Sequence, residues 1–364
     1  MIRNESDMFV LDTHCDTPSQ ILRLRDLSKD NHHAHVDFPK LRRGGVDGVF
    51  FALYVPSSLD SDSDKAFEYA CRLLSGVEKA VGDNCDAAAL VRTSAEAYAN
   101  KEQNKISVFL GLENGAPIGY DVGRLKFFYN RGIRYITLCH SADNQICDSC
   151  ASAVKRWRGL SPFGRELIAE MNCMGMLIDV SHVSDDSFYD VLEHSSLPVA
   201  ATHSCCRSLA DHPRNMSDEM IKALAEAGGV IQINFYPYFL DDCFGKVLES
   251  TGKMKEWELA ESAFIADPGN PVHRNAWNAA QDEIMAVSRP SFRLIADHID
   301  HVVSLVGIDH VGLGSDFDGI EVTPDGLDDI SMMPVLFDEL HSRGYSEDDL
   351  CKIAGGNFFR VSGL

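Results

Sequence analysis

The sequence predicts a parallel (β/α)8 TIM barrel, and three observations carry that prediction. Eight short apolar segments recur along the chain, at residues 8–14, 46–55, 106–113, 134–140, 176–182, 198–203, 230–236 and 310–316. Segments with helical spacing of apolar residues lie between most of them, which is the alternation of βα units. Polar, metal-competent residues close several of the apolar segments. We therefore expect one domain over residues 1–364, with its chemistry at the carboxyl ends of the strands.

Composition narrows the class of protein. The 364 residues are 45% hydrophobic and 24% charged, which is typical of a folded globular chain. No apolar stretch reaches the roughly 18 residues of a membrane span, and the N-terminus lacks the basic-then-apolar order of a secretory signal. The eleven cysteines are odd in number and irregularly spaced, so we expect reduced thiols. We expect a cytoplasmic protein with no membrane partner.

The net charge excludes another class of partner. The formal charge is -22 at pH 7, so the phosphates of a nucleic acid would be repelled. Small substrates and divalent cations fit this charge better.

The first strand leads directly into a polar series. Apolar residues over 9–11 precede Asp12, His14 and Asp16, and period-two alternation would place these three side chains on one face of the strand. Residues 20–40 that follow are polar and contain the histidine tract at 31–35. This tract resembles a short metal-binding sequence, but we interpret it as part of a solvated loop.

The middle of the chain continues the alternation. Residues 46–55 form an apolar, β-branched and aromatic run, typical of a strand covered on both faces. Residues 65–81 have one apolar stripe at helical spacing, which predicts a helix. The strand at 106–113 ends on the carboxylate of Glu113.

Three further strands end in histidine, at His140, His182 and His203. Between the first two, Ser161 suits a helix N-cap, a proline follows it, and Gly175 stands just beyond the predicted end at 172. Ser184 is expected to cap the next helix.

The last third of the chain contains one break in the pattern. A helix is expected over 217–227, but residues 237–290 are too long for an ordinary connection. Their amphipathic, charged sequence predicts a helical insertion that could form a lid. The alternation then resumes with a helix at 291–306, the strand that ends at Asp316, and closing helices at 327–343 and 346–361.

The residues at the strand ends form one constellation. Any single histidine is more often structural, but the convergence of seven metal-competent residues indicates a site. Four imidazoles and three carboxylates exceed the three protein ligands of one catalytic zinc, so two metal ions fit better. The seven residues are His14, Asp16, Glu113, His140, His182, His203 and Asp316.

Five of the seven candidate ligands can be divided between two metal ions. We expect His14 and Asp16 on one ion, His182 and His203 on the other, and Glu113 as the bridge. A hydroxide held between two cations near neutral pH would attack a carbonyl carbon, so the expected reaction class is hydrolysis.

Asp316 is left without a metal in this assignment. It lies in the turn GLGSDFDG, whose glycines do not fit a dinucleotide-binding motif. A carboxylate beside a metal hydroxide can orient it, take its proton and pass that proton to the leaving amine. We expect Asp316 to be this acid–base residue.

The sequence resembles the membrane dipeptidase family (renal dipeptidase, peptidase M19) of dinuclear zinc enzymes, within the amidohydrolase-like barrels. The matching stretches span almost the whole chain in family order, and the long segment ending in DVSHVS is the most diagnostic. They are DTHCD at 12–16, GLEN at 111–114, YITLCH at 135–140, GLSPFGRELIAEMNCMGMLIDVSHVS at 159–184, THS at 202–204, HPRNMSDE at 212–219, NFY at 234–236 and GSDFDG at 314–319.

The resemblance implies a function and further residues. It implies a dipeptidase with two Zn²⁺ ions bridged by Glu113 and a water or hydroxide. His140 would bind the scissile carbonyl oxygen, Arg214 would anchor the substrate's C-terminal carboxylate, and Tyr236 would line the same pocket. Tolerance of a D-residue at the C-terminal position is common in the family, and a homodimer is expected.

Two departures and two alternatives accompany this resemblance. Asn114 stands where family members often carry a second glycine, and the signal and anchor segments of the mammalian members are missing, which favours a soluble bacterial-type member. Another barrel amidohydrolase, such as a deacetylase or lactonase, is the first alternative, although most of these begin with His-x-His and many use a lysine bridge. A metal-retaining binding protein without catalysis is the second.

Overall fold

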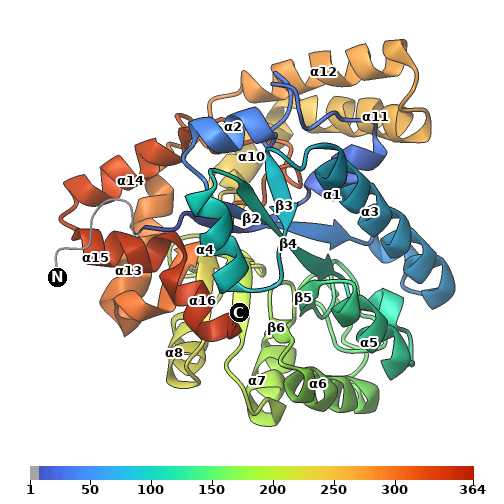
Figure 1. The fold of residues 1–364 in the computed structure, drawn as a ribbon, viewed down its shortest axis with the longest axis vertical. Helices are drawn as coiled ribbons and strands as arrows, with labels where there is room; N and C mark the ends of the chain where they lie inside the picture. Colours follow the sequence, from blue (N-terminus) through green and yellow to red (C-terminus); the bar gives the residue numbers. More distant parts are fainter. Residues whose placement is uncertain (1–7) are drawn as a thin grey trace.

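A computed structural model describes residues 8–364 and forms a parallel barrel surrounded by helices (Figure 1). Its strands follow one another in the order β1-β2-β4-β5-β6-β7-β8-β9, and every pairing is parallel. A parallel bridge between Cys15 at the end of β1 and Phe317, which follows the last strand, brings the two ends of the sheet together. The predicted (β/α)8 class is therefore confirmed. The strands are β1 (Leu11–Cys15), β2 (Gly48–Tyr54), β4 (Ile106–Glu113), β5 (Ile133–Thr137), β6 (Leu177–Asp179), β7 (Ala200–Ser204), β8 (Val230–Ile233) and β9 (Val311–Leu313).

The eight predicted strands are all present, but several end earlier than predicted. The segments predicted at 134–140 and 176–182 stop at Thr137 and Asp179. His182 and Asp316 have left-handed φ angles of 70° and 65°, which ends extended pairing before either residue. A short additional strand that was not predicted, β3 (Ala88–Leu90), pairs with β4 outside the barrel.

Side-chain caps fix the starts of several helices. The Ser161 hydroxyl accepts the Gly164 N–H at 2.9 Å, and Gly175 ends the same helix in the left-handed conformation, as predicted. Ser184 and Ser217 cap the next two helices. The helices around the barrel are α3 (Ser63–Asp83), α4 (Ser94–Glu102), α5 (Val122–Asn130), α6 (Pro162–Met174), α7 (Asp185–His194), α8 (Asp218–Glu226), α13 (Arg293–Val306), α14 (Met333–Ser342), α15 (Glu347–Cys351) and α16 (Asn357–Ser362).

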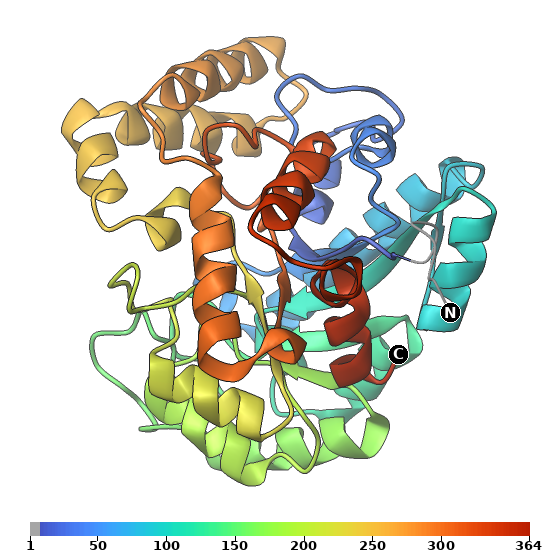
Figure 2. The ribbon, with the colours of Figure 1, turned by 90° about the vertical axis from the view of Figure 1, so that its left-hand side faces the viewer.

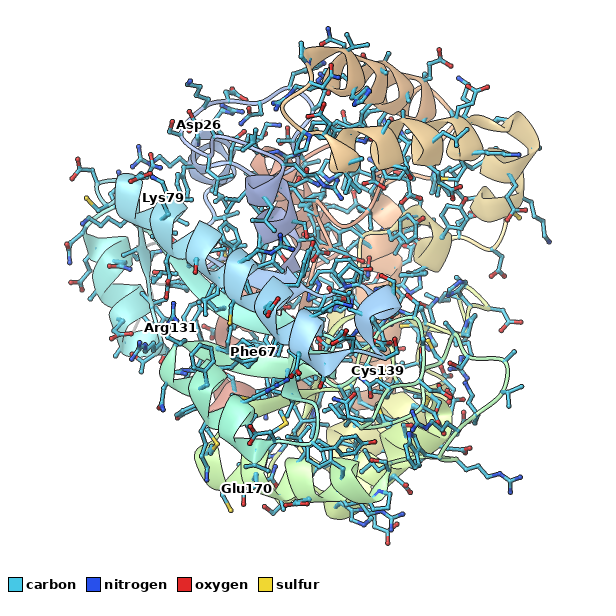
Figure 3. All side chains as sticks on the ribbon, turned by 90° about the vertical axis from the view of Figure 1, so that its right-hand side faces the viewer. Asp26, Phe67, Lys79, Arg131, Cys139 and Glu170 are labelled. Carbon is cyan, nitrogen blue, oxygen red and sulfur yellow. The ribbon has the colours of Figure 1, made fainter. Side chains whose placement is uncertain are left out.

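Two apolar layers hold the barrel together. Inside it, Phe50 and Phe109 stack with ring centroids 4.8 Å apart, and Phe358 of α16 meets Phe50 edge-on. Outside it, alternate strand residues pack against the helices, where Phe67 of α3 covers part of the core (Figure 3). The inner and outer layers together exclude water from both faces of the sheet, as expected for a parallel barrel.

The prediction of a solvated loop over residues 20–40 is wrong in part. The segment contains the end of α1 (Thr17–Leu22) and the start of α2 (Phe38–Arg43), and its residues 34–38 are buried. Asp318 is the reason: it forms an ion pair with Arg25 at 2.6 Å, and its N–H donates to His35 Nδ1 at 3.0 Å. Residues 34–38 therefore pack against the loop that follows β9.

Residues 237–290 form helices, as predicted. They are α9 (Pro237–Leu240), α10 (Phe244–Thr251), α11 (Lys253–Ala266) and α12 (Pro271–Met285), which project from one corner of the molecule (Figure 2). Glu261 of α11 pairs with Arg23 at 2.9 Å, and the Gln281 amide donates to the Glu321 carbonyl at 2.6 Å. Because Arg23 and Glu321 follow β1 and β9, the insertion lies at the carboxyl end of the barrel. Among residues 8–364, no helix has the length and apolarity needed to cross a membrane.

Candidate metal centre

The structure brings all seven predicted strand-end residues together at the carboxyl end of the barrel. They form three overlapping groups, and the ligand-type atoms within each group lie within 4.8 Å of one another. The groups are His14, Glu113 and His203; Glu113, His140 and His182; and His14, Asp16 and Asp316.

Glu113 lies at the centre of this cluster, at the end of β4. Its Oε1 is 3.1 Å from His182 Nε2 and 3.5 Å from His203 Nε2. Its Oε2 is 3.4 Å from His14 Nε2. The two oxygens of one carboxylate therefore face different imidazoles.

The β1 side of the cluster is built around Asp16, which occupies the N-cap position of α1. Its Oδ2 lies 3.9 Å from His14 Nε2 and close to Gly319, where an added Cβ would be 2.0 Å from that oxygen. Only glycine at this position leaves room for the carboxylate. Asp12, which alternation predicted on the same face, instead accepts hydrogen bonds from Ser315 because a register shift interrupts β1 after Asp12.

Hydrogen bonds at the far ring nitrogens orient two of the histidines. The Thr202 hydroxyl donates to Asp179 at 2.7 Å, so its oxygen is left to accept from His203 Nδ1 at 2.9 Å. The Tyr135 hydroxyl is likewise directed to the Thr13 carbonyl and contacts His14 Nδ1 at 2.9 Å. With Nδ1 held in this way, the Nε2 atom of each imidazole points towards Glu113, and this is the atom through which each histidine would bind a metal.

Burial and neighbouring charges shift the pKa values of these groups in opposite directions. Burial raises the pKa of Glu113, but the charge of His14 and the neighbouring imidazoles of His182 and His203 outweigh it and hold that pKa well below its usual range. Burial, followed by the Glu113 charge, raises the pKa of Asp16 well above its ordinary value. Burial lowers the pKa values of His182 and His203, which favours neutral imidazoles.

These residues are suited to binding divalent metal. Three buried atoms at the centre have no hydrogen-bond partner: His14 Nε2, Asp16 Oδ1 and Glu113 Oε2. Buried polar atoms without a partner are costly, and a cation would satisfy all three. His182 Nε2 and His203 Nε2 lie 2.9 Å apart, close to the spacing of two ligands on one ion. Imidazole nitrogens with carboxylate oxygens are a donor set that suits zinc.

His140 and Arg214 lie beside the cluster. His140 Nε2 is 3.9 Å from Glu113 Oε1, and its ring packs edge-on against Tyr54. Burial lowers the pKa of His140, although the charge of Glu113 partly opposes this shift. Arg214 is buried: one end of its guanidinium donates to the His203 carbonyl at 3.0 Å, whereas its Nε has no partner.

Asp316 and Tyr236 each have a polar neighbour that the sequence analysis missed. The Asn234 amide donates to Asp316 Oδ2 at 2.9 Å, which leaves Oδ1 on the side of His14, 4.0 Å from its Nε2. The Tyr236 hydroxyl donates to the buried carboxylate of Glu321. Asn234 precedes Tyr236 by two residues and could have been found from that stretch, but no sequence signal marked Glu321.

A parallel barrel with a histidine and carboxylate cluster at the carboxyl ends of its strands defines a metal-dependent hydrolase of the amidohydrolase-like class. Comparison with known proteins gives the family. A family model described as membrane dipeptidase (peptidase family M19) matches residues 4–363. The chain belongs to this family.

Individual relatives agree with this assignment. The dipeptidase aclJ of Aspergillus oryzae is 31% identical over 98% of this chain and 76% of its own length. The dipeptidase verJ of Clonostachys rogersoniana is 32% identical over 90% of this chain and 75% of its own length. The predicted enzyme class, a hydrolase of the dipeptidase type, is confirmed.

Solved structures share the fold. The probable dipeptidase PvdM from Pseudomonas aeruginosa superposes with a TM-score of 0.82 at 25% identity, covering 99% of this chain and 96% of its own. A metallopeptidase from Rhodobacter sphaeroides, liganded with a phosphinate mimic of the dipeptide L-Ala-D-Ala, gives a TM-score of 0.78 at 24% identity, covering 98% and 99%.

Proposed function

We propose that this chain is a zinc dipeptidase that hydrolyses the single peptide bond of a dipeptide at a two-metal site. The observation that carries the proposal is the position of Glu113, whose two carboxylate oxygens face different imidazoles. A carboxylate in that position can bridge two ions.

The proposed ligands divide into two sets that share this bridge. His14 and Asp16 would hold one ion, His182 and His203 the other, and Glu113 both. When bound, such ions supply Lewis acidity for the carbonyl and lower the pKa of water. The unpartnered atoms His14 Nε2, Asp16 Oδ1 and Glu113 Oε2 support this ligand set.

The protein's own side chains account for the remaining steps. Asp316, oriented by Asn234, would take a proton from the attacking water and deliver it to the leaving amine nitrogen. His140, beside Glu113 on the loop after β5, would donate a hydrogen bond to the scissile carbonyl oxygen as negative charge develops there.

Arg214 would fix the end of the substrate. Its buried guanidinium keeps an Nε donor without a partner, and a planar fork of donors matches a carboxylate. A free C-terminal carboxylate beside the metal site distinguishes a dipeptide from a lactone, whose carboxyl group is tied up in the ester. Tyr236 would line the same pocket.

The test compares a dipeptide with its C-terminal amide. Wild-type protein loaded with zinc should hydrolyse the dipeptide much faster than the amide, and Arg214→Ala should raise KM for the dipeptide and narrow that difference. Equal turnover of both substrates by wild type would contradict the role of Arg214. Tight binding of a dipeptide without turnover would favour a binding protein.

We also propose that a D-residue is accepted at the C-terminal position, as the dipeptide mimic bound to the Rhodobacter structure suggests for that relative. Zinc-loaded protein should turn over both L-Ala-D-Ala and L-Ala-L-Ala. Turnover of the L,L substrate alone would reject this part of the proposal. The homodimer and the cytoplasmic location stay predictions.

A further inference from the structure

The histidine tract at residues 31–35 is divided between two environments. His35 is buried and its Nδ1 accepts the Asp318 N–H, so it belongs to the packing beneath the loop. His32 and His33 instead face outward, with ring centroids 4.8 Å apart. The packing of His35 thus leaves two adjacent imidazoles at the surface.

These two imidazoles meet a carboxylate from the insertion. His33 Nε2 lies 3.1 Å from Asp282 Oδ1 on α12, and ligand-type atoms of His32, His33 and Asp282 all lie within 4.8 Å of one another. Two ligands on a tetrahedral zinc are about 3.3 Å apart, given Zn–N and Zn–O distances near 2.0–2.1 Å. The spacing of His33 and Asp282 is close to that value.

The surroundings leave room for a hydrated cation. A cavity of about 380 Å³ lies beside the cluster, lined by the loop residues His32 and His33 and by Trp277 of α12. Three arginines also border this cavity: Arg23 is paired with Glu261 and Arg25 with Asp318, whereas Arg274 donates to the Pro268 carbonyl. Two of the three charges are therefore largely neutralised, and water can complete the coordination of an ion.

We propose that His32, His33 and Asp282 form a separate binding site for a zinc-type divalent ion, which clamps α12 to the loop that follows α1. Two imidazoles and one carboxylate are the usual protein ligands of an open zinc site. Figure 3 shows this loop, where Asp26 is labelled, close to the insertion helices. The ion would add a link between α12 and this loop beside the ion pair of Arg23 with Glu261.

The experiment counts zinc in full-length protein. Wild type, His33→Ala, Asp282→Asn and the control His341→Ala are saturated with zinc, dialysed against the same free zinc concentration and analysed by mass spectrometry. His341 is an exposed histidine 3.8 Å from Glu347, away from the insertion, and so serves as a matched control. Wild type and His341→Ala should each hold one zinc per chain more than His33→Ala and Asp282→Asn.

A second measurement follows the clamp itself. Zinc should slow tryptic cleavage within residues 241–290 in wild type and in His341→Ala, but not in the two site variants. Equal zinc content in all four proteins would overturn the proposal. Because the result is a difference between variants, it does not depend on how many ions the site around Glu113 holds, and dipeptide turnover should be the same in all four.

Discussion

The two ends of the barrel interior are built from the same strands but differ in chemistry, since one is an apolar core and the other is a polar cluster. Near the amino end, Phe50, Phe109 and Phe358 fill the interior with stacked rings. Near the carboxyl end, the same strand β4 presents Glu113 to buried imidazoles. The first arrangement stabilises the fold, whereas the second buries charges that remain costly until a ligand compensates them. The aromatic layer near the amino end thus stabilises a barrel whose carboxyl end carries a costly, unliganded site.

Tyr135 joins the two layers. Its ring belongs to the apolar layer and lies over Gly111, where an added Cβ would be 2.2 Å from the ring. Its hydroxyl reaches His14. A glycine on β4 therefore allows one large side chain to pack below and to orient a proposed metal ligand above.

The largest effect is expected from Glu113→Gln. Removing the bridging charge should remove bound metal and lower kcat/KM by at least about 10³-fold, since loss of a single charge-stabilising group already costs about 10²–10³. The melting temperature of the metal-free protein should fall, because Glu113 compensates the buried charge of His14 and its removal leaves that charge unpaired. Metal analysis, kinetics and thermal melts check this. A variant that keeps its metal and activity would contradict the bridging role.

The next effect is expected from Asp316→Asn. It should lower kcat by about 10²–10⁴-fold, the range of general acid–base catalysis, with metal content unchanged. Asp318→Asn is the matched comparison two residues away: it breaks the buried pair with Arg25, so it should reduce stability by about 3–5 kcal/mol rather than turnover of the folded protein. Equal kinetic losses in both variants would argue against an acid–base role for Asp316.

In the apolar layer, Phe109→Ala should lower the free energy of unfolding by about 3–5 kcal/mol, because Phe109 is fully buried and a cavity would remain. The folded fraction should still bind metal. Urea unfolding and metal analysis of the same sample check this. A loss of metal with little loss of stability would show that the two layers are not separable.

The smallest effect concerns Glu321, the partner of Tyr236. Burial raises the pKa of Glu321 from 4.5 to about 7, although the hydrogen bond from Tyr236 partly opposes it. The folded state therefore binds this proton more tightly than the unfolded state, and stability should fall as pH rises from about 4.5 through 7, by on the order of 3 kcal/mol. In Glu321→Gln this decline should be smaller, because Asp12 and Asp60, whose pKa values are each raised to about 6, contribute the remainder. Urea unfolding at pH 5 and pH 8 compares the two, and parallel behaviour would refute the shift.

The sequence predicted most of the barrel and the convergence of the site, for physical reasons. Buried strands of a parallel barrel are apolar on both faces, and strand ends meet at one rim, so His14, Glu113 and His203 could be placed together without a structure. The early ends of β6 and β9 were not predictable, because the left-handed residues that follow them, His182 and Asp316, carry no composition signal.

Contacts between segments far apart in the chain also could not be predicted from the sequence. The burial of residues 34–38 depends on Asp318, almost 300 positions away, and the pairing of Tyr236 with Glu321 depends on how the loop after β9 folds back. Periodicity reports on one element at a time, so it cannot reveal which loops meet.

The most direct test of the central claim is anomalous diffraction at the zinc edge from crystals of the zinc-loaded protein. We predict two peaks at the mouth of the barrel, one beside each carboxylate oxygen of Glu113, with His14 on one side and His182 and His203 on the other. A single peak there, or two peaks that do not share Glu113, would contradict the account.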